Sequence, residues 1–247
     1  GIVCGKYIKN EMRNILLRTT HAKLNPFGYA VYDEDTDYSV KHNLMVRDAL
    51  VNCIFNGMKG FEVHYQPIAE VSTGRWIGVE ALCRWTAPDG TKVSPERFIK
   101  YAEQLGIIGR IDEWVRLTAM KQCVELGLHE KQFTLDINFS PTQRLTDKFI
   151  NKLRDTISDT GFPSEKLNLG ITESAQMDFD SETIESLNKL TEIGVKLSLD
   201  DFGTGYSSFE NLIKLSAIAL KTDKIFIDDI ESDDYKKYLL NMVVDLA

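Results

Sequence analysis

The sequence has 247 residues, of which 43% are hydrophobic and 27% charged, and its formal net charge is −8. This length is enough to bury the core of one large domain or two smaller ones, and the ordinary Gly and Pro content excludes disordered and collagen-like chains. Non-specific binding of DNA or RNA requires a basic face. We therefore expect no nucleic-acid polymer as a partner.

The apolar stretches are short, and charges interrupt them well before the roughly 20 residues that a membrane span requires. We predict no membrane segment in this chain. The first ten residues lack the basic and apolar regions of a secretory signal. The four cysteines are scattered without a CxxC pair, which favours reduced thiols over a zinc site or a disulfide framework. These features predict a cytoplasmic protein.

The first 60 residues differ in character from the rest. We predict a helix over residues 11–22, a strand over residues 28–32 and a second helix over residues 40–58, with Gly57 and Gly60 near its end. This stretch is too short to be a domain of its own, and it leads into the remainder of the chain.

From residue 61 onward, short apolar runs alternate with helical patterns. The predicted strands are residues 61–67, 76–85, 133–139, 167–172, 195–200 and 218–223. Between them, Ser94-Pro95 and Ser140-Pro141 each place a capping hydroxyl before a proline that suits a first helical turn. This alternation predicts an α/β fold with a parallel sheet covered by helices, either doubly wound or closed into a barrel.

Polar side chains lie in or near the ends of these apolar runs, where buried strands usually avoid them. They are Glu80, Asn138, Glu173, Asp200, Asp201, Lys221 and Asp223. In a barrel, the carboxyl ends of parallel strands meet on one face, so these groups would surround one site. Carboxylate and amide oxygens are the ligands that Mg²⁺ and Mn²⁺ prefer.

Such a cluster suits phosphodiester chemistry, because two divalent ions neutralise phosphate oxygens and activate water, and a nearby lysine orients that water or stabilises negative charge. Each residue alone also has a structural interpretation. Glu80 and Glu173 would serve as helix caps or surface groups, and Asn138 would support a turn. Lys221 is harder to explain structurally, since an unpaired buried ammonium is costly. The set is more specific than any member.

Five stretches in register resemble the ordered motifs of EAL-domain cyclic-di-GMP phosphodiesterases. They are Tyr65-Gln66-Pro67, Gly78-Val79-Glu80-Ala81-Leu82-Cys83-Arg84-Trp85, Ile171-Thr172-Glu173-Ser174, Asp200-Asp201-Phe202-Gly203-Thr204-Gly205-Tyr206-Ser207-Ser208 and Leu220-Lys221-Thr222-Asp223. The resemblance implies a TIM-like (β/α) barrel of EAL type with an antiparallel first strand. It also implies metal-dependent hydrolysis of one phosphodiester bond of cyclic-di-GMP, giving linear pGpG.

The resemblance further implies a role for each matching residue. A two-metal site for Mg²⁺ or Mn²⁺ would use Glu80, Asn138, Glu173, Asp200 and Asp201. Lys221 would contact the catalytic water or the metal shell, acting with Glu80 and Asp200 in catalysis.

Other positions match the dinucleotide contacts and a regulatory loop of the family. Gln66, Leu82 and Arg84 match substrate-binding positions, the arginine being a natural partner for phosphate. Residues 202–208 match a loop that couples the metal site to a dimer interface, which implies a homodimer. The glycines of this loop would let it rearrange, or would form a tight turn.

The sequence also departs from the family pattern. Gly170 stands where relatives usually have Glu, and Thr222 where they usually have Ile. The later AEGVE-like and QGY-like segments are not present, so we expect an incomplete barrel. We assign residues 1–45 to an N-terminal segment that faintly resembles the end of a GGDEF domain, and residues 46–247 to the EAL domain. The alternative to an enzyme is an inactive cyclic-di-GMP receptor or regulatory module.

Overall fold

The computed structural model describes residues 34–140, 142–172, 181–202 and 219–246. The chain divides into two compact units, Gly1–Asn52 and Cys53–Ala247. Helix α2 (Glu34–Phe55) accounts for the predicted helix over residues 40–58, although it begins and ends earlier. The predicted helix over residues 11–22 and strand over residues 28–32 lie outside the described residues. The GGDEF-like tail and the boundary at residue 45 stay predictions.

The second unit contains a seven-stranded sheet in the order β1-β2-β4-β5-β6-β7, with β3 paired to β2. The strands are β1 (Phe61–Ala69), β2 (Trp76–Thr86), β3 (Lys92–Val93), β4 (Thr134–Phe139), β5 (Leu167–Thr172), β6 (Lys196–Phe202) and β7 (Ala219–Thr222). The pair β1–β2 is antiparallel, whereas β2, β4, β5, β6 and β7 run parallel. The predicted α/β class with an antiparallel first strand is confirmed, and in the described part of the chain the sheet stays open beyond β7.

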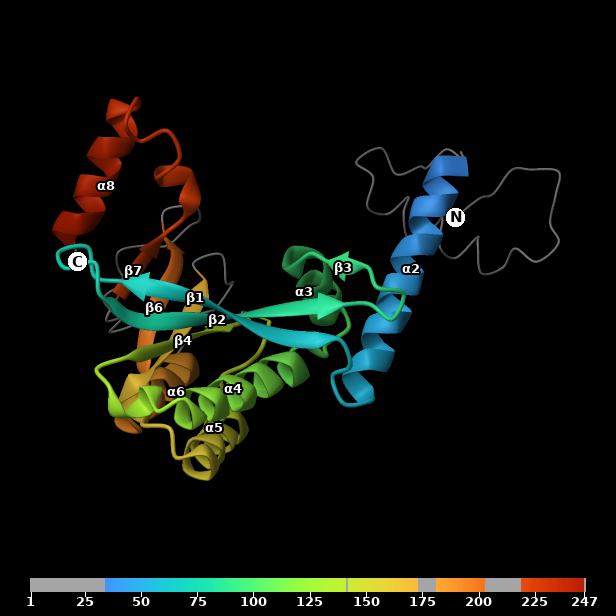
Figure 1. Ribbon diagram of the computed structural model, residues 1–247, viewed down its shortest axis with the longest axis horizontal. Coiled ribbons are helices and arrows are strands. Elements are labelled where there is room, and N and C mark those ends of the chain that lie inside the picture. The colour runs from blue at the N-terminus through green and yellow to red at the C-terminus, as the bar shows by residue number, and fades with distance from the viewer. Residues whose placement is uncertain (1–33, 141, 173–180, 203–218, 247) are drawn as a thin grey trace. The chain divides into compact units, whose positions relative to one another are not determined.

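Helices cover one face of this sheet. The helices of this unit are α3 (Pro95–Gln104), α4 (Ile108–Glu125), α5 (Asp147–Thr160), α6 (Ser181–Glu192) and α8 (Asp234–Leu246), with short 3₁₀ turns η1 (Leu128–Glu130), η2 (Ser164–Lys166) and η3 (Lys224–Phe226). In Figure 1, α4, α5 and α6 lie together on the same side of the central strands. Helices α4, α5 and α6 follow β2, β4 and β5 in the chain, as in an α/β fold in which helices connect parallel strands.

The two predicted helix starts have different outcomes. Helix α3 begins at Pro95 with Ser94 at its N-cap position, but the Ser94 hydroxyl makes no capping hydrogen bond. The prediction of a helix start after Ser140 is wrong, because α5 begins at Asp147, where the Thr146 hydroxyl accepts a hydrogen bond from the Phe149 amide. Ser140 instead donates its hydroxyl to Glu103 at 2.8 Å. The Ser140 hydroxyl, which the local sequence pattern predicts as a helix cap, therefore forms its hydrogen bond with Glu103, 37 positions away.

The core of the unit lies between the sheet and its helices. Alternate residues of the central strands point toward the helices, as the twofold period of a strand requires. Leu135, Leu169 and Leu197 are each no more than 1% exposed. Full burial of such a side chain contributes about 1.5–3 kcal/mol of stability. These residues hold the parallel strands in fixed register.

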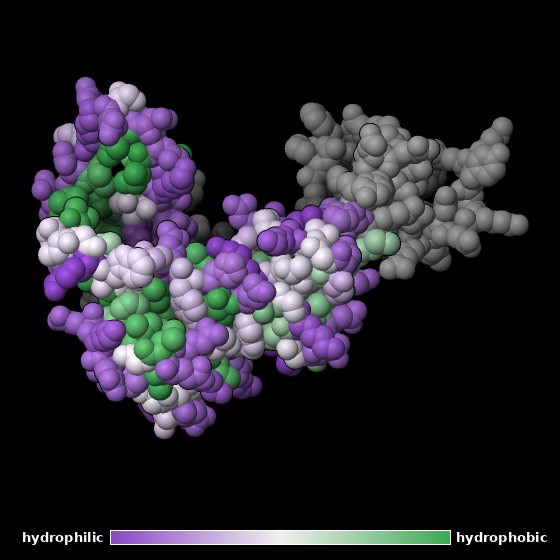
Figure 2. Space-filling view, viewed as in Figure 1, coloured by the Kyte–Doolittle hydropathy of each residue, from purple (hydrophilic) through white to green (hydrophobic). Residues whose placement is uncertain are grey.

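Hydrophobic side chains are also exposed on the C-terminal elements. Figure 2 shows a largely hydrophilic surface with hydrophobic areas, some of them over the part of the unit that holds α8. Ile225 and Ile227 follow β7, and Met242 and Val244 lie on α8, all exposed. None of the helices in the described ranges is long and apolar enough to cross a membrane. Cys53, Cys83 and Cys123 are free thiols.

Candidate functional site

The side chains that alternate with the buried leucines form the opposite, inner face of the central strands. This inner face consists of Asp136, Asn138, Asn168, Ser198 and Asp200, to which Glu80 on β2 and Lys221 on β7 are joined. The outer face of the sheet packs against helices, so the hydrophobic packing of that face does not account for the polar side chains on the inner face. Their hydrogen bonds show which of them act together.

Glu80 and Asn138 are in direct contact. They come from the neighbouring parallel strands β2 and β4, in which Glu80 pairs with Asp136 and Asn138 follows two residues later on the same face. The Asn138 amide donates a hydrogen bond from Nδ2 to Glu80 Oε1 at 2.8 Å. Two residues that the sequence placed in one site, 58 positions apart, therefore meet.

Asp200 lies on β6 close to this pair. Its side chain accepts a hydrogen bond from the Ser198 hydroxyl at 3.1 Å, and the residue is only 8% exposed. Burial raises the pKa of the Asp200 carboxyl to about 6, against the opposing effect of Lys221, and the charge of Glu80 raises it further. Glu80 and Asp200 lie on the same face of the sheet, and the charge of Glu80 acts on Asp200.

Lys221 bridges two carboxylates of this site. Its Nζ lies 3.0 Å from Asp136 Oδ2 and 3.4 Å from Asp200 Oδ1. Burial alone would lower the pKa of the Lys221 ammonium, but Asp200 and Asp136, together with Glu80, outweigh it and raise that pKa. Lys221 therefore carries a full positive charge at neutral pH, and its burial is explained by its partners.

Three members of the inner face were missed by the reasoning from sequence: Asp136, Asn168 and Ser198. Asn168 Nδ2 donates to Asp136 Oδ2 at 2.9 Å and to Ser198 Oγ at 3.1 Å. These hydrogen bonds link the neighbouring strands β4, β5 and β6, and Ser198 in turn contacts Asp200. The signal that would have found two of them is the twofold period, because Asp136 precedes Asn138 by two residues and Ser198 precedes Asp200 by two.

Gly170 makes room for the Asp200 carboxylate. A Cβ atom added at Gly170 would lie 2.3 Å from Asp200 Oδ2, so in this conformation any side chain at this position would displace the carboxylate. The departure from the usual family residue at this position therefore touches the site directly, although it removes no expected metal ligand.

Asp201 and Asp223 lie at irregular places in the backbone. Asp201 has a φ of +58°, and the pairing of β6 with β7 changes register between Leu199 and Phe202. This irregularity breaks the strict alternation of side chains at the end of β6, as a β-bulge does beside many active sites. Asp223 instead caps η3, since its carboxylate accepts a hydrogen bond from the Ile225 amide at 2.7 Å.

The positions expected to bind substrate lie on β1 and β2, next to the carboxylates. Gln66 pairs directly across from Glu80, and Leu82 and Arg84 follow Glu80 on the same face of β2 at intervals of two residues. The Arg84 guanidinium donates from Nη1 to the Cys83 carbonyl at 2.9 Å, which leaves other N–H groups for a ligand. Glu173 and loop residues 203–208 lie outside the described residues.

The oxygen atoms of this face suit a hard divalent cation. Glu80, Asn138 and Asp200 provide carboxylate and amide oxygens, and Asn168 Oδ1 is buried without a hydrogen-bond partner among the described residues. No group of three His, Cys, Asp or Glu side chains within those residues is close enough to form a complete metal site. The donor chemistry fits Mg²⁺ or Mn²⁺, while the set present here is partial.

Comparison with known proteins agrees with this arrangement. The EAL domain family matches residues 47–247. The chain is 36% identical over 188 residues to the cyclic di-GMP phosphodiesterase NbdA of Pseudomonas aeruginosa. The matched stretch is 75% of this chain and 24% of NbdA. It is 32% identical over 229 residues to the oxygen sensor protein DosP of Escherichia coli, covering 90% of this chain and 28% of DosP. The chain thus spans about a quarter of the length of the curated relatives it matches.

Solved structures show the same fold. The PaMucR phosphodiesterase in complex with c-di-GMP has a TM-score of 0.72 and 32% identity, over 80% of this chain and 81% of that one. The EAL enzyme Bd1971, in its form bound to cAMP and cyclic-di-GMP, has a TM-score of 0.77 and 28% identity, over 97% of this chain and 64% of that one. With its sheet order, its polar inner face and the match over residues 47–247, this chain belongs to the EAL domain family.

Proposed function

We propose that this chain hydrolyses one phosphodiester bond of cyclic-di-GMP to give linear pGpG, with Mg²⁺ or Mn²⁺ as cofactor. At the level of the family, the phosphodiesterases among its relatives support hydrolysis of cyclic-di-GMP. The observation that carries the proposal is that two contacting pairs, Glu80 with Asn138 and Lys221 with Asp200, lie on the same face of the sheet.

The cofactor would be held by oxygen ligands from several strands. Glu80, Asn138 and Asp200, together with Asp201 and Glu173, are the proposed ligands of two divalent ions. When bound, such ions neutralise phosphodiester oxygens and lower the pKa of water toward neutrality. Asn168 donates a hydrogen bond to the carboxylate of Asp136, and Ser198 donates one to the carboxylate of Asp200, so both carboxylates are held in position. These hydrogen bonds would hold the carboxylates ready for the cations.

The remaining side chains would bind and stabilise the substrate. The Lys221 ammonium, which contacts two carboxylates, would orient a water molecule or stabilise negative charge on the phosphate. Arg84 would contact a phosphate of the dinucleotide, and Gln66 and Leu82 would line the same surface of β1 and β2.

The alternative function is a cyclic-di-GMP receptor that binds without turnover. To separate the two, the purified chain is incubated with cyclic-di-GMP in the presence of Mg²⁺, Mn²⁺ or EDTA, and the products are resolved by chromatography. We expect pGpG with either metal and none with EDTA. Stoichiometric retention of cyclic-di-GMP without pGpG would support the receptor and reject the enzyme.

We also infer a homodimer from the resemblance of residues 202–208 to the family loop that couples the metal site to a dimer interface. Equilibrium ultracentrifugation over a concentration range tests this. A mass of twice the chain mass at high concentration is expected, whereas a single monomer mass throughout contradicts it.

A further inference from the structure

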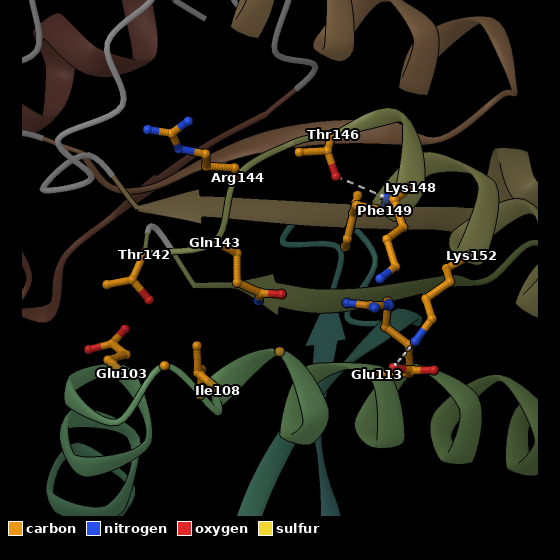
Figure 3. A pocket seen from close by; sticks show the side chains of 13 residues that line it. Glu103, Ile108, Glu113, Thr142, Gln143, Arg144, Thr146, Lys148, Phe149 and Lys152 are labelled. Atoms are coloured by element: carbon orange, nitrogen blue, oxygen red, sulfur yellow. Dashed lines mark hydrogen bonds and ion pairs between the residues drawn. The ribbon is translucent and has the colours of Figure 1, made fainter.

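A second pocket lies away from the inner face of the sheet. It has a volume of about 430 Å³ and is formed by the start of α4, the segment before α5 and the first turns of α5. None of the residues proposed to hold metal or cyclic-di-GMP lines it. Figure 3 shows side chains from these separate segments converging on one hollow. This separation makes it a candidate for a different ligand.

The most unusual residue of this pocket is Arg116 on α4. It is only 3% exposed, yet its Nε and Nη1 atoms have no hydrogen-bond partner among the described residues. Burial lowers the pKa of the guanidinium, whereas the charges of Asp112 and Glu113 raise it. One face of the group stacks over the ring of Phe149, 4.8 Å from its centroid. Both atoms are closed to solvent, and buried charged donors without partners are costly, so a ligand that accepts their hydrogen bonds once the lining side chains shift is favoured.

Two lysines on α5 add positive charge at the same place. In Figure 3, Lys148 and Lys152 both point from α5 toward Glu113 on α4. Lys152 Nζ forms an ion pair with Glu113 Oε2 at 2.6 Å, which neutralises that carboxylate. Lys148 makes no hydrogen bond or ion pair with any described residue, so its ammonium is available to a ligand. The centre of the pocket is therefore cationic, although the whole chain is acidic.

The start of helix α4 faces the same pocket. This helix has 18 residues, and no side chain caps its N-terminus. Gly106 and Gly109 line the pocket, and a Cβ atom added at Gly109 would lie 2.9 Å from Gln143 Oε1. The Gln143 side chain thus packs against the first turn of the helix, in space that a larger residue at position 109 would fill. An uncapped helix start carries partial positive charge and presents backbone N–H groups to anions.

We propose that this pocket binds the phosphate group of a small phosphorylated molecule. The planar guanidinium of Arg116 matches two phosphate oxygens, Lys148 supplies a second cation, and the start of α4 supplies N–H donors. The two nearby glutamates have other partners, since Glu113 pairs with Lys152 and Glu103 accepts the hydroxyl of Ser140. The volume exceeds that of a phosphate ion and lies in the range of pockets for small molecules.

Isothermal titration calorimetry of the purified chain tests this site. The probes are inorganic phosphate and ribose 5-phosphate, and EDTA is present so that no divalent ion contributes. We expect saturable binding of one molecule per chain. The Arg116→Lys variant should bind about tenfold more weakly or worse, because a lysine cannot replace the two parallel hydrogen bonds. Lys148→Ala should bind several-fold more weakly, and Lys121→Ala, an exposed control on the same helix, should bind normally.

Three further results decide the outcome. Binding of ribose 5-phosphate without inorganic phosphate supports a phosphomonoester site, and binding of both supports recognition of the phosphate itself. Asp200→Asn on the inner face should leave phosphate binding unchanged. No saturable binding of either probe up to about 10 mM, wild-type affinity in Lys148→Ala, or loss of binding in Asp200→Asn would each overturn the proposal. Lys148 is exposed, so this variant keeps the test valid even if Arg116→Lys fails to fold.

Discussion

The outer and inner faces of strands β4, β5 and β6 are built from alternating residues of the same segments, but they differ in chemistry. Leu135, Leu169 and Leu197 on the outer face are buried against helices and form the core. Asp136, Asn168 and Asp200 on the inner face form hydrogen bonds and ion pairs across strands. One face is thus explained by packing, and the other requires a function.

In this sheet, one face contributes mainly to stability and the other carries the candidate functional site. The outer face gains free energy by removing apolar surface from water. The inner face buries carboxylates, which opposes folding unless partners or cations compensate. A substitution on the outer face should therefore lower the stability of the fold, whereas a substitution on the inner face should lower activity. The following experiments test that contrast.

The largest effect is expected for Asp200→Asn, which removes a charge from the inner face while keeping the shape of the side chain. We expect turnover of cyclic-di-GMP to fall about a thousandfold, because a lost metal ligand removes several kcal/mol of charge stabilisation. Steady-state kinetics by chromatography of pGpG measure it, with Lys121→Ala as the exposed control. Wild-type turnover in Asp200→Asn would remove this residue from the site.

Leu169→Ala tests the outer face. This side chain is 1% exposed, so its truncation should lower the free energy of unfolding by about 2–5 kcal/mol through lost burial and the cavity left behind. Urea denaturation followed by circular dichroism measures the loss, again against Lys121→Ala. A loss below about 1 kcal/mol would show that the outer face does not carry the stability assigned to it.

Arg84→Ala tests the edge of the inner face, where substrate contact is expected without metal ligation. We expect KM for cyclic-di-GMP to rise about tenfold with a smaller change in kcat, since a phosphate contact made equally in the ground and transition states affects binding. Initial rates over a range of substrate concentrations separate the two constants. An unchanged KM would exclude Arg84 from substrate binding.

The last prediction concerns pH and stability without metal. Burial raises the pKa of Asp200 to about 6 in the folded chain, whereas an Asp in the unfolded chain titrates near 3.9. The raised pKa makes the ionised carboxylate unfavourable to folding, a penalty absent below about pH 4 and complete above about pH 6. In EDTA, the stability of Asp200→Asn relative to wild type should rise across this window.

Denaturation midpoints measured at several pH values between about 4 and 7 give this difference directly. Because Asn does not ionise, a difference that stays constant over the whole range would show that Asp200 is not buried as described.

Much of this fold was readable from the sequence, because its signals are local. The predicted strands agree with β1, β2, β4, β5, β6 and β7 apart from small shifts at their ends. Apolar runs of strand length bounded by turn residues are a strong signal. The helix start after Ser140 was predicted wrongly, since the Ser140 hydroxyl bonds to Glu103, 37 positions away, and no local pattern contains that contact.

The candidate site was readable in part. Glu80, Asn138, Asp200 and Lys221 are apparent as polar residues at the ends of apolar strands, and in the structure Glu80 contacts Asn138 while Lys221 contacts Asp200. Asp136 escaped notice because a single Asp within a run of apolar residues is ambiguous until its partner Lys221, which comes much later in the chain, is placed beside it. Pairings of this kind depend on the register between strands, which sequence alone does not specify.

The most direct test of the central claim is a titration of the purified chain with Mn²⁺, in which the electron paramagnetic resonance signal of free Mn²⁺ reports binding without any need for turnover. We predict saturable binding that is at least about tenfold weaker in Asp200→Asn, because the loss of one charged ligand removes more than about 1.4 kcal/mol. Equal Mn²⁺ affinity in the two proteins would contradict the account.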